Sequence, residues 1–382
     1  MDRYLRYSRG LAAALGSLAI AGLSSWIPSG EAQQAPRSWR ISSRPLLAIG
    51  SREQPGPEAF GSVLGATRSP SGEVTVVDGR SLELKVFSPT GKPLRVSGGK
   101  GEGPGEFRTI VAIQRCMGDS LFVYDGALFR VSVFGPDGAF VRTLDLRRWS
   151  PHGLPPYDFW CHRSGTRAFL HRSTDPPAGE GPFRPSVEIS LLGPKDSVVR
   201  LGRFPASERY FKDGAAGPRP FGRRTTIGLG SRYLYVGTGD APEVSQYSLR
   251  GEPVRTVHWT RAPVPVTATH VDWYVRAFIA RRAGRVNTGE VERYLRALSW
   301  PKAFPAYDRI LVDASDNLWV EDYPIPDVSQ REWTVFNATG KRVAALTVPS
   351  GFRALEVGRD YVLGVWTDEL DVEYVRLFTL VK

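Results

Sequence analysis

Hydrophobic and polar positions alternate with a period of two residues along much of the chain. In the stretch 71–107, apolar residues fill every second position of three short runs, and Asp-Gly at 78–79 and Pro-Thr-Gly at 89–91 separate these runs. Such alternation between turn residues is typical of β-strands rather than helices. The runs lie at 74–76, 82–86 and 94–96. Together they predict a small antiparallel meander.

The same order of strands and turns recurs, so the meander is one copy of a repeat. The sequence predicts six copies, at 61–97, 109–145, 158–201, 225–259, 310–348 and 354–380. The third copy is irregular, and the sixth supplies only three strands. A lone strand near 46–49 is followed by a loop whose Gly-Pro, Glu and Phe return in order in the loop 98–107. We therefore expect this N-terminal strand to complete the sixth copy.

Six four-stranded copies predict an all-β fold, a six-bladed β-propeller closed by its N-terminal strand. Closure would remove the sheet edge that an open ring exposes. The 40 glycines and 30 prolines of the 382 residues agree with many short strands joined by turns. Two stacked β-sandwiches are the alternative, which the shared loop before the first two repeats disfavours.

One segment follows the period of a helix instead. Between 267 and 298, two apolar stripes have helical spacing, and Asn287 followed by Glu290 indicates a capped helix start. We expect a small helical insertion, 264–303, between blades four and five. It would be either a lid or partner-docking element on one face of the ring, or packing that covers an apolar patch of adjacent blades.

The first residues indicate export. Three arginines precede an apolar run at 11–25, and Gly-Glu-Ala at 30–32 suits a signal peptidase. We expect a signal peptide, 1–32, that leaves a mature propeller, 33–382, in the periplasm or outside the cell. An uncleaved anchor is the alternative. The sequence predicts no integral membrane span after cleavage, because no second apolar stretch follows.

A net charge of +11 would attract anions. The arginines are scattered, however, without a basic run or a basic-aromatic motif of a nucleic-acid module. We interpret them as a solvated basic surface and expect no nucleic-acid partner.

Repeat two contains Leu-Phe-Val-Tyr-Asp-Gly at 121–126, then Arg-Val-Ser-Val-Phe at 130–134 and Pro-Asp-Gly at 136–138. This pattern resembles an NHL-type repeat, and the loop 98–107 resembles the Gly-rich loop that leads into the next NHL blade. The chain as a whole resembles the exported six-bladed propellers of bacteria. Repeats three, four and six depart from the pattern, and Glu83 stands at the position matching Arg130. Because that family is heterogeneous in activity, the resemblance implies fold more than function.

Catalytic signatures are lacking in the sequence. It has no His-Glu-x-x-His, paired Cys-x-x-Cys or Gly-x-Ser-x-Gly motif. The Gly-rich loop lacks a Gly-Lys-Ser/Thr ending and carries Glu102 and Glu106, which would repel a phosphate, so we interpret it as a connector. His162 and His171 flank a predicted hairpin and lie too far apart along it to share a metal ion. No catalytic residue is therefore predicted.

Aspartates recur at or near the end of the second strand of five blades. Propeller topology would place them on one face, where they could form a binding rim, and the lactonase-like propellers imply Ca²⁺ for such a rim. Alternatively, each aspartate caps its own turn, which we favour. These residues are Asp78, Asp125, Asp240, Asp322 and Asp368.

Two functions follow from these patterns. The first is a binding or scaffold module without a cofactor, which holds a peptide, glycan or protein partner on one face of the ring. The alternative is a metal-dependent, lactonase-like hydrolase or lyase with Ca²⁺ or Zn²⁺ in the central channel.

Cys116 and Cys161 are the only cysteines. Each ends the first strand of its blade, in adjacent blades, so they occupy equivalent positions. In an oxidising compartment such a pair would form a disulfide if its Cα atoms lay within about 7 Å. We expect the bridge, and two separate buried thiols are the alternative.

Overall fold

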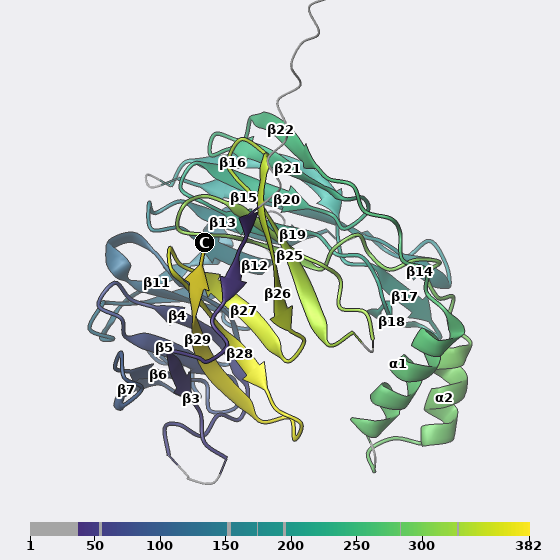
Figure 1. Ribbon diagram of the computed structural model, residues 1–382, viewed down its shortest axis with the longest axis horizontal. Helices are drawn as coiled ribbons and strands as arrows, with labels where there is room; N and C mark the ends of the chain where they lie inside the picture. The colour runs from purple at the N-terminus through teal and green to yellow at the C-terminus, as the bar shows by residue number, and fades with distance from the viewer. Residues whose placement is uncertain are drawn as a thin grey trace, which may run out of the picture. The chain divides into compact units, whose positions relative to one another are not determined.

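Strands dominate the computed structural model, which describes residues 37–52, 56–150, 154–173, 175–193, 196–282, 284–326 and 328–382. Figure 1 shows the strands gathered into small sheets, with two helices to one side. The predicted signal peptide, 1–32, lies outside the described residues. Within the described ranges, no helix has both the length and the apolar character needed to cross a membrane.

Repeats one and two fold as four-stranded antiparallel sheets, as predicted. Sheet 1 contains β4 (Val63–Arg68), β5 (Val74–Asp78), β6 (Glu83–Phe87) and β7 (Pro93–Gly98). Sheet 2 contains β8 (Ile110–Arg115), β9 (Leu121–Asp125), β10 (Arg130–Phe134) and β11 (Phe140–Asp145). Every residue of β5 and β9 is buried, whereas β7 and β11 are largely exposed. The inner strands therefore have neighbours on both faces, and the last strands face water.

Repeats three, four and five also form four-stranded antiparallel sheets, and in repeat three β14 (Gly181–Phe183) lies between the second and third strands along the chain but belongs to another sheet. Sheet 3 contains β12 (Pro156–Cys161), β13 (Arg167–Arg172), β15 (Ser186–Leu192) and β16 (Val198–Pro205). Sheet 4 contains β19 (Thr226–Leu229), β20 (Tyr233–Gly237), β21 (Glu243–Ser248) and β22 (Pro253–His258). Sheet 5 contains β23 (Arg309–Val312), β24 (Leu318–Glu321), β25 (Gln330–Phe336) and β26 (Arg342–Pro349).

Sheet 6 combines the two ends of the described chain. Its C-terminal strands are β27 (Phe352–Val357), β28 (Tyr361–Thr367) and β29 (Glu373–Val381). The N-terminal β3 (Leu47–Ile49) pairs antiparallel with β29, and Ile49 lies opposite Val375. Two further short strands were not predicted: β2 (Arg40–Ile41) also pairs with β29, and β1 (Arg37–Ser38) pairs in parallel with β26.

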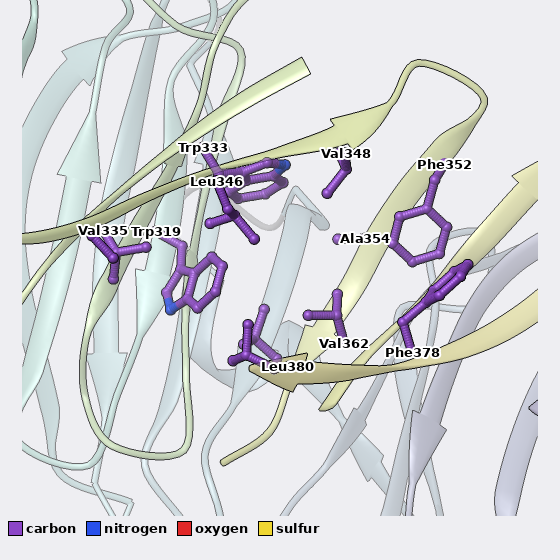
Figure 2. Close-up of a cluster of buried hydrophobic side chains, with 12 residues drawn as sticks. Trp319, Trp333, Val335, Leu346, Val348, Phe352, Ala354, Val362, Phe378 and Leu380 are labelled. Carbon is purple, nitrogen blue, oxygen red and sulfur yellow. The ribbon is translucent and has the colours of Figure 1, made fainter. Parts of the chain in front are cut away.

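Buried hydrophobic clusters connect each sheet with the next. One cluster joins sheets 1 and 2, and others join sheets 2 and 3, 3 and 4, 4 and 5, and 5 and 6. Figure 2 shows the last of these, in which Trp319 of sheet 5 lies near Leu380 of sheet 6 and Trp333 lies beside Leu346. A further cluster joins sheet 6 to sheet 1 and includes Leu47 and Ile49 of β3. Each sheet thus packs against the sheets before and after it, which stacked sandwiches would not produce.

Two helices and a small sheet lie outside this series. The helices are α1 (Ala268–Ala280) and α2 (Thr288–Arg296), and Asn287 caps α2 as predicted, since its side chain accepts a hydrogen bond from the Glu290 amide. The small sheet contains β14 (Gly181–Phe183), β17 (Arg209–Lys212) and β18 (Ala215–Pro218), and the sequence pattern does not predict it. Figure 1 shows it beside the helices. The helices bury their apolar stripes against each other and against Tyr210 of β17.

Cys116 and Cys161 form a disulfide between sheets 2 and 3, and their Cα atoms lie 5.4 Å apart. Cys116 follows β8 and Cys161 ends β12, so the bridge joins the ends of two neighbouring first strands. Both side chains lie in the hydrophobic cluster between the two sheets.

Candidate functional site

A cavity of about 1070 Å³ is lined by the first strand of every one of the six sheets, β4, β8, β12, β19, β23 and β27. The repeat pattern explains this placement, because equivalent strands of equivalent units occupy equivalent positions. We call this cavity the channel.

Arginine contacts link the beginnings of these first strands. Arg353 of β27 donates to the Val63 carbonyl of β4 at 3.0 Å, and Arg309 of β23 donates to the Ala354 carbonyl of β27 at 2.7 Å. Arg224, just before β19, pairs with Asp308, just before β23, at 2.9 Å. The beginnings of four first strands therefore lie at one end of the channel. We call this end the channel mouth.

Part of the mouth is apolar and exposed. The second residues of β4, β8 and β12 are Leu64, Val111 and Tyr157, and their exposed fractions are 42%, 39% and 41%. All three line the channel. A Cβ on Gly79 would lie 2.6 Å from Leu64, and a Cβ on Gly126 would lie 2.7 Å from Val111. Glycine after Asp78 and Asp125 therefore provides room for the channel-facing side chains.

The charged part of the mouth contains Asp158, which is half-buried on β12 and lines the channel. Within the described part of the chain, the hydrogen bond to its carboxylate comes from the Phe159 amide, at 2.8 Å. Burial raises the pKa of Asp158 to about 6, although the Phe159 amide and the charge of Arg224 act in the opposite direction. Burial also raises the pKa of Asp308.

Further pairs hold the walls of the mouth in place. Arg309 pairs with the fully buried Glu321, which Arg331 approaches to 3.3 Å. The Glu373 carboxylate accepts a hydrogen bond from the Val63 amide at 2.5 Å, joining sheets 6 and 1. Because these bonds cross from sheet to sheet, they fix the positions of the first strands around the cavity.

A second charged group lies where the first strands end. The Glu356 carboxylate accepts from the Thr67 hydroxyl at 2.5 Å and from the Tyr361 hydroxyl. Burial and the charge of Glu356 raise the pKa of Tyr361. The Arg68 guanidinium lies 4.8 Å from the centre of the Tyr361 ring. These contacts join sheets 1 and 6, so we interpret this group as structural.

Three of the five predicted aspartates bind nearby backbone amides. Asp125 accepts hydrogen bonds from four amides, two before β8 and two in the turn after β9. Asp368 accepts from the Leu370 and Val372 amides, at 2.9 Å each. Asp78 accepts from the Arg80 amide at 3.0 Å and from Lys85 at 2.8 Å. Burial alone would raise the pKa of Asp78, but these hydrogen bonds lower it overall.

Among the described residues, the side chains of Asp240 and Asp322 form no bond to a turn amide and instead pair with arginines. Asp240 binds Arg184 at 2.8 Å and Arg223 at 2.6 Å, and Asp322 pairs with Arg261. Turn capping is therefore the wrong interpretation for these two. Among the described residues, no three histidine, cysteine, aspartate or glutamate side chains are grouped so that they could hold a metal ion.

The histidines and the Gly-rich loop have local roles. His171 is buried, donates to or accepts from the Ser190 hydroxyl at 2.9 Å, and has its pKa lowered by burial to about 4. His162 contacts Ser164 in the predicted turn. Arg130 donates to the carbonyls of Glu102, Gly103 and Glu106, so it fixes the loop that enters sheet 2. These contacts agree with the interpretation of the loop as a connector.

A second cavity, of about 400 Å³, lies between sheet 4 and the segments that flank the helices. Its charged lining consists of Arg219, Arg223, Arg261, Lys302, Glu208 and Asp240. Arg223 pairs with both Glu208 and Asp240, and Arg261 pairs with Asp322, so most of these charges are already neutralised.

Asp158 is not among the site residues that the sequence pattern predicts. One feature of the sequence could have pointed to it: Asp158 is an acidic residue inside the first strand of an irregular repeat, at a position that is apolar in repeats one and two. Arg224 and Asp308 could not be paired from the sequence, because 84 residues separate them.

No family model matches the chain, and no curated protein matches its sequence. Among solved structures, a member of the DUF4221 family from Bacteroides vulgatus matches 91% of this chain and 99% of its own, with a TM-score of 0.52 and 10% identity. The chain has a propeller-like fold.

Two weaker structural likenesses cover similar lengths. A candidate exported protein from Bacteroides fragilis matches 90% of this chain and 95% of its own, with a TM-score of 0.48 and 13% identity. A calcium-binding protein, regucalcin, from Agrobacterium tumefaciens matches 90% and 96%, with a TM-score of 0.44 and 12% identity. At these identities, a propeller-like fold carries no activity with it.

Proposed function

We propose that the chain is an exported six-bladed propeller, closed by β3, that binds a peptide, glycan or protein partner at the channel mouth. The pairing of β3 with β29 and the hydrophobic cluster between sheets 6 and 1 support closure. The disulfide agrees with maturation in an oxidising compartment.

One observation carries the binding proposal. Leu64, Val111 and Tyr157 expose about two-fifths of their surface inside a cavity, at the same position of three successive sheets. Apolar side chains that line a concave site next to a few polar groups are typical of ligand pockets. A partner that enters the mouth would remove these side chains from water, which is favourable. The neighbouring Asp158 and Arg224 would fix its orientation.

Blocking the mouth tests the proposal. Leu64→Trp would fill the apolar part, whereas Leu94→Trp places the same ring on β7, where Leu94 is 48% exposed but does not line the channel. Thermal shifts of the full chain would be recorded with panels of short peptides and oligosaccharides. We expect the compounds that stabilise the wild type to stabilise Leu94→Trp equally and to lose their effect on Leu64→Trp. Equal shifts in both variants would place the binding site elsewhere.

The metal-dependent alternative calls for a separate measurement. Elemental analysis of the purified chain and thermal unfolding with added Ca²⁺ would detect a resident ion. Stoichiometric Ca²⁺ or Zn²⁺ would favour the hydrolase or lyase. A metal-free preparation without a shift on adding Ca²⁺ would favour the binding module.

A further inference from the structure

The carboxylate of Asp158 has no counter-ion of its own within the described residues. Its hydrogen bond comes from the neighbouring Phe159 amide, and Arg224 is the cation whose charge acts on it. Burial raises its pKa to about 6, so it is ionised at pH 7.5. A half-buried ionised carboxylate without a partner is costly, since charge is stabilised in protein interiors by pairing and hydrogen bonding.

Arg224 is already committed to another acid. Its guanidinium pairs with the Asp308 carboxylate at 2.9 Å, and its Nε donates to the Asp308 carbonyl at 3.3 Å. Arg224 therefore stands between two carboxylates, of which it neutralises one. Of these two carboxylates, Asp158 is the one without an ion pair among the described residues.

The neighbouring arginines are also engaged. Arg309 pairs with Glu321 and donates to the Ala354 carbonyl. Arg172 of β13 lies over the Tyr157 ring, 4.8 Å from its centre. Asp158 lines the same cavity as the exposed apolar side chains of the first three sheets.

We propose that the channel mouth takes an organic ammonium ion, whose N–H groups donate to Asp158 and whose apolar part lies against Leu64, Val111 and Tyr157. This inference rests on the proposed function, because it names the ligand class of the same mouth. The ammonium ion would supply the ion-pair partner that Asp158 lacks among the described residues, and charge-assisted N–H to carboxylate bonds are among the strongest hydrogen bonds in proteins. Its apolar part gains from leaving water.

Three probes with the same phenyl body separate charge from apolar contact. They are the 2-phenylethylammonium ion, the neutral 2-phenylethanol and the 3-phenylpropionate anion, titrated calorimetrically into the full chain at pH 7.5. We expect the ammonium ion to bind at least about 10-fold more tightly than the other two. Asp158→Asn should remove this preference while the variant stays folded, because an amide oxygen still accepts from the Phe159 amide. Asp137→Asn, in an exposed turn of sheet 2, is the matched control and should leave binding unchanged.

Each other outcome overturns the inference. Tighter binding of 3-phenylpropionate, unchanged ammonium affinity in Asp158→Asn, or no binding of the ammonium probe would contradict an ammonium site at Asp158. Binding to the Leu64→Trp variant distinguishes failure of the ammonium site from failure of the proposed function. If peptides or oligosaccharides still lose their effect on Leu64→Trp, the mouth remains the binding site and only its ligand class is wrong. If the ammonium probe binds Leu64→Trp as it binds the wild type, it binds outside the mouth.

Discussion

Gly79 and Gly126 illustrate how a turn motif serves the channel. Asp-Gly is turn chemistry, in which glycine commonly serves by adopting a positive φ. Neither glycine has a positive φ in the structure. The glycines are required because Leu64 and Val111 lie directly over them. Sequence patterns cannot reveal this contact, since it joins a channel-facing side chain to the turn of another strand.

Gly79→Ala therefore tests the packing at the mouth. The new Cβ would lie 2.6 Å from the Leu64 Cγ, so Leu64 must move. We expect a loss of about 1–3 kcal/mol in the free energy of unfolding, the usual cost of overpacking. Gly217→Ala is the control, because nothing lies within 4 Å of its Cβ position and its φ is not positive. Urea unfolding of both variants would measure the difference, and equal stabilities would contradict the packing explanation.

Asp158→Asn tests whether this carboxyl reduces stability. Its pKa is about 6 in the folded chain, whereas an ordinary aspartate has a pKa of 3.8, the value we take for the unfolded chain. The folded state therefore holds the proton more tightly. Stability supplied by the protonated form is therefore present below about pH 4 and is lost as the pH rises through 6. We expect Asp158→Asn to match the wild type near pH 4 and to exceed it by about 1–3 kcal/mol above pH 7.

Unfolding of both proteins across pH 4–8 would measure this difference. His171, whose pKa is lowered to about 4, has the opposite pH dependence, but it is present in both proteins and cancels in the comparison. A wild type that is more stable than Asp158→Asn at pH 7.5 would show that the carboxyl has a stabilising partner.

Aspartates differ in how far the sequence predicts their role. Asp78, Asp125 and Asp368 bind amides close to the turns that their own repeats define, so local pattern was sufficient. Asp240 and Asp322 bind arginines on the segments that lead to the small sheet and the helices. These segments interrupt the repeat, and their positions in space are set by packing that a periodic pattern does not encode.

At the scale of elements, the strands of the repeats were predictable to within a few residues, because alternation and turn chemistry are local signals. The small sheet was not. Its strands are short, and β18 consists of Ala-Ala-Gly-Pro, a poor strand-forming sequence. Tyr210 of β17 packs against the helices, so long-range contact supports this sheet.

The disulfide is the element-scale feature with the clearest expected effect. It closes a loop of 45 residues between the ends of β8 and β12. In the chain-entropy model, such a bridge contributes roughly 4 kcal/mol. We expect Cys116→Ser to lower the free energy of unfolding by about this amount, and reduction of the wild type to do the same. Mass spectrometry of the unreduced, alkylated chain would detect the bridge directly, and two alkylated cysteines would refute it.

At the scale of the whole molecule, repeat counting predicted the order of the sheets and the partner of the N-terminal strand. The inference was possible because sixfold repetition left one strand missing at the C-terminal end and one to spare at the N-terminal end. The channel chemistry could not be obtained in this way. Asp158, Arg224 and Asp308 come from three parts of the chain, and only the arrangement of sheets 3, 4 and 5 brings them to one cavity.

The proposed closure of the ring by β3 would support the channel and its mouth, and N-terminal truncation tests this proposal most directly. Removing residues 33–50 deletes β3, whereas removing 33–44 deletes only β1 and β2 and serves as the control. Leu47 and Ile49 are buried in the cluster between sheets 6 and 1, so losing both should cost about 3–6 kcal/mol beyond the control. The unpaired edge of β29 should also promote association. Urea unfolding with light scattering is the measurement: we predict a less stable, self-associating 33–50 deletion, and a monomer as stable as the control would contradict closure.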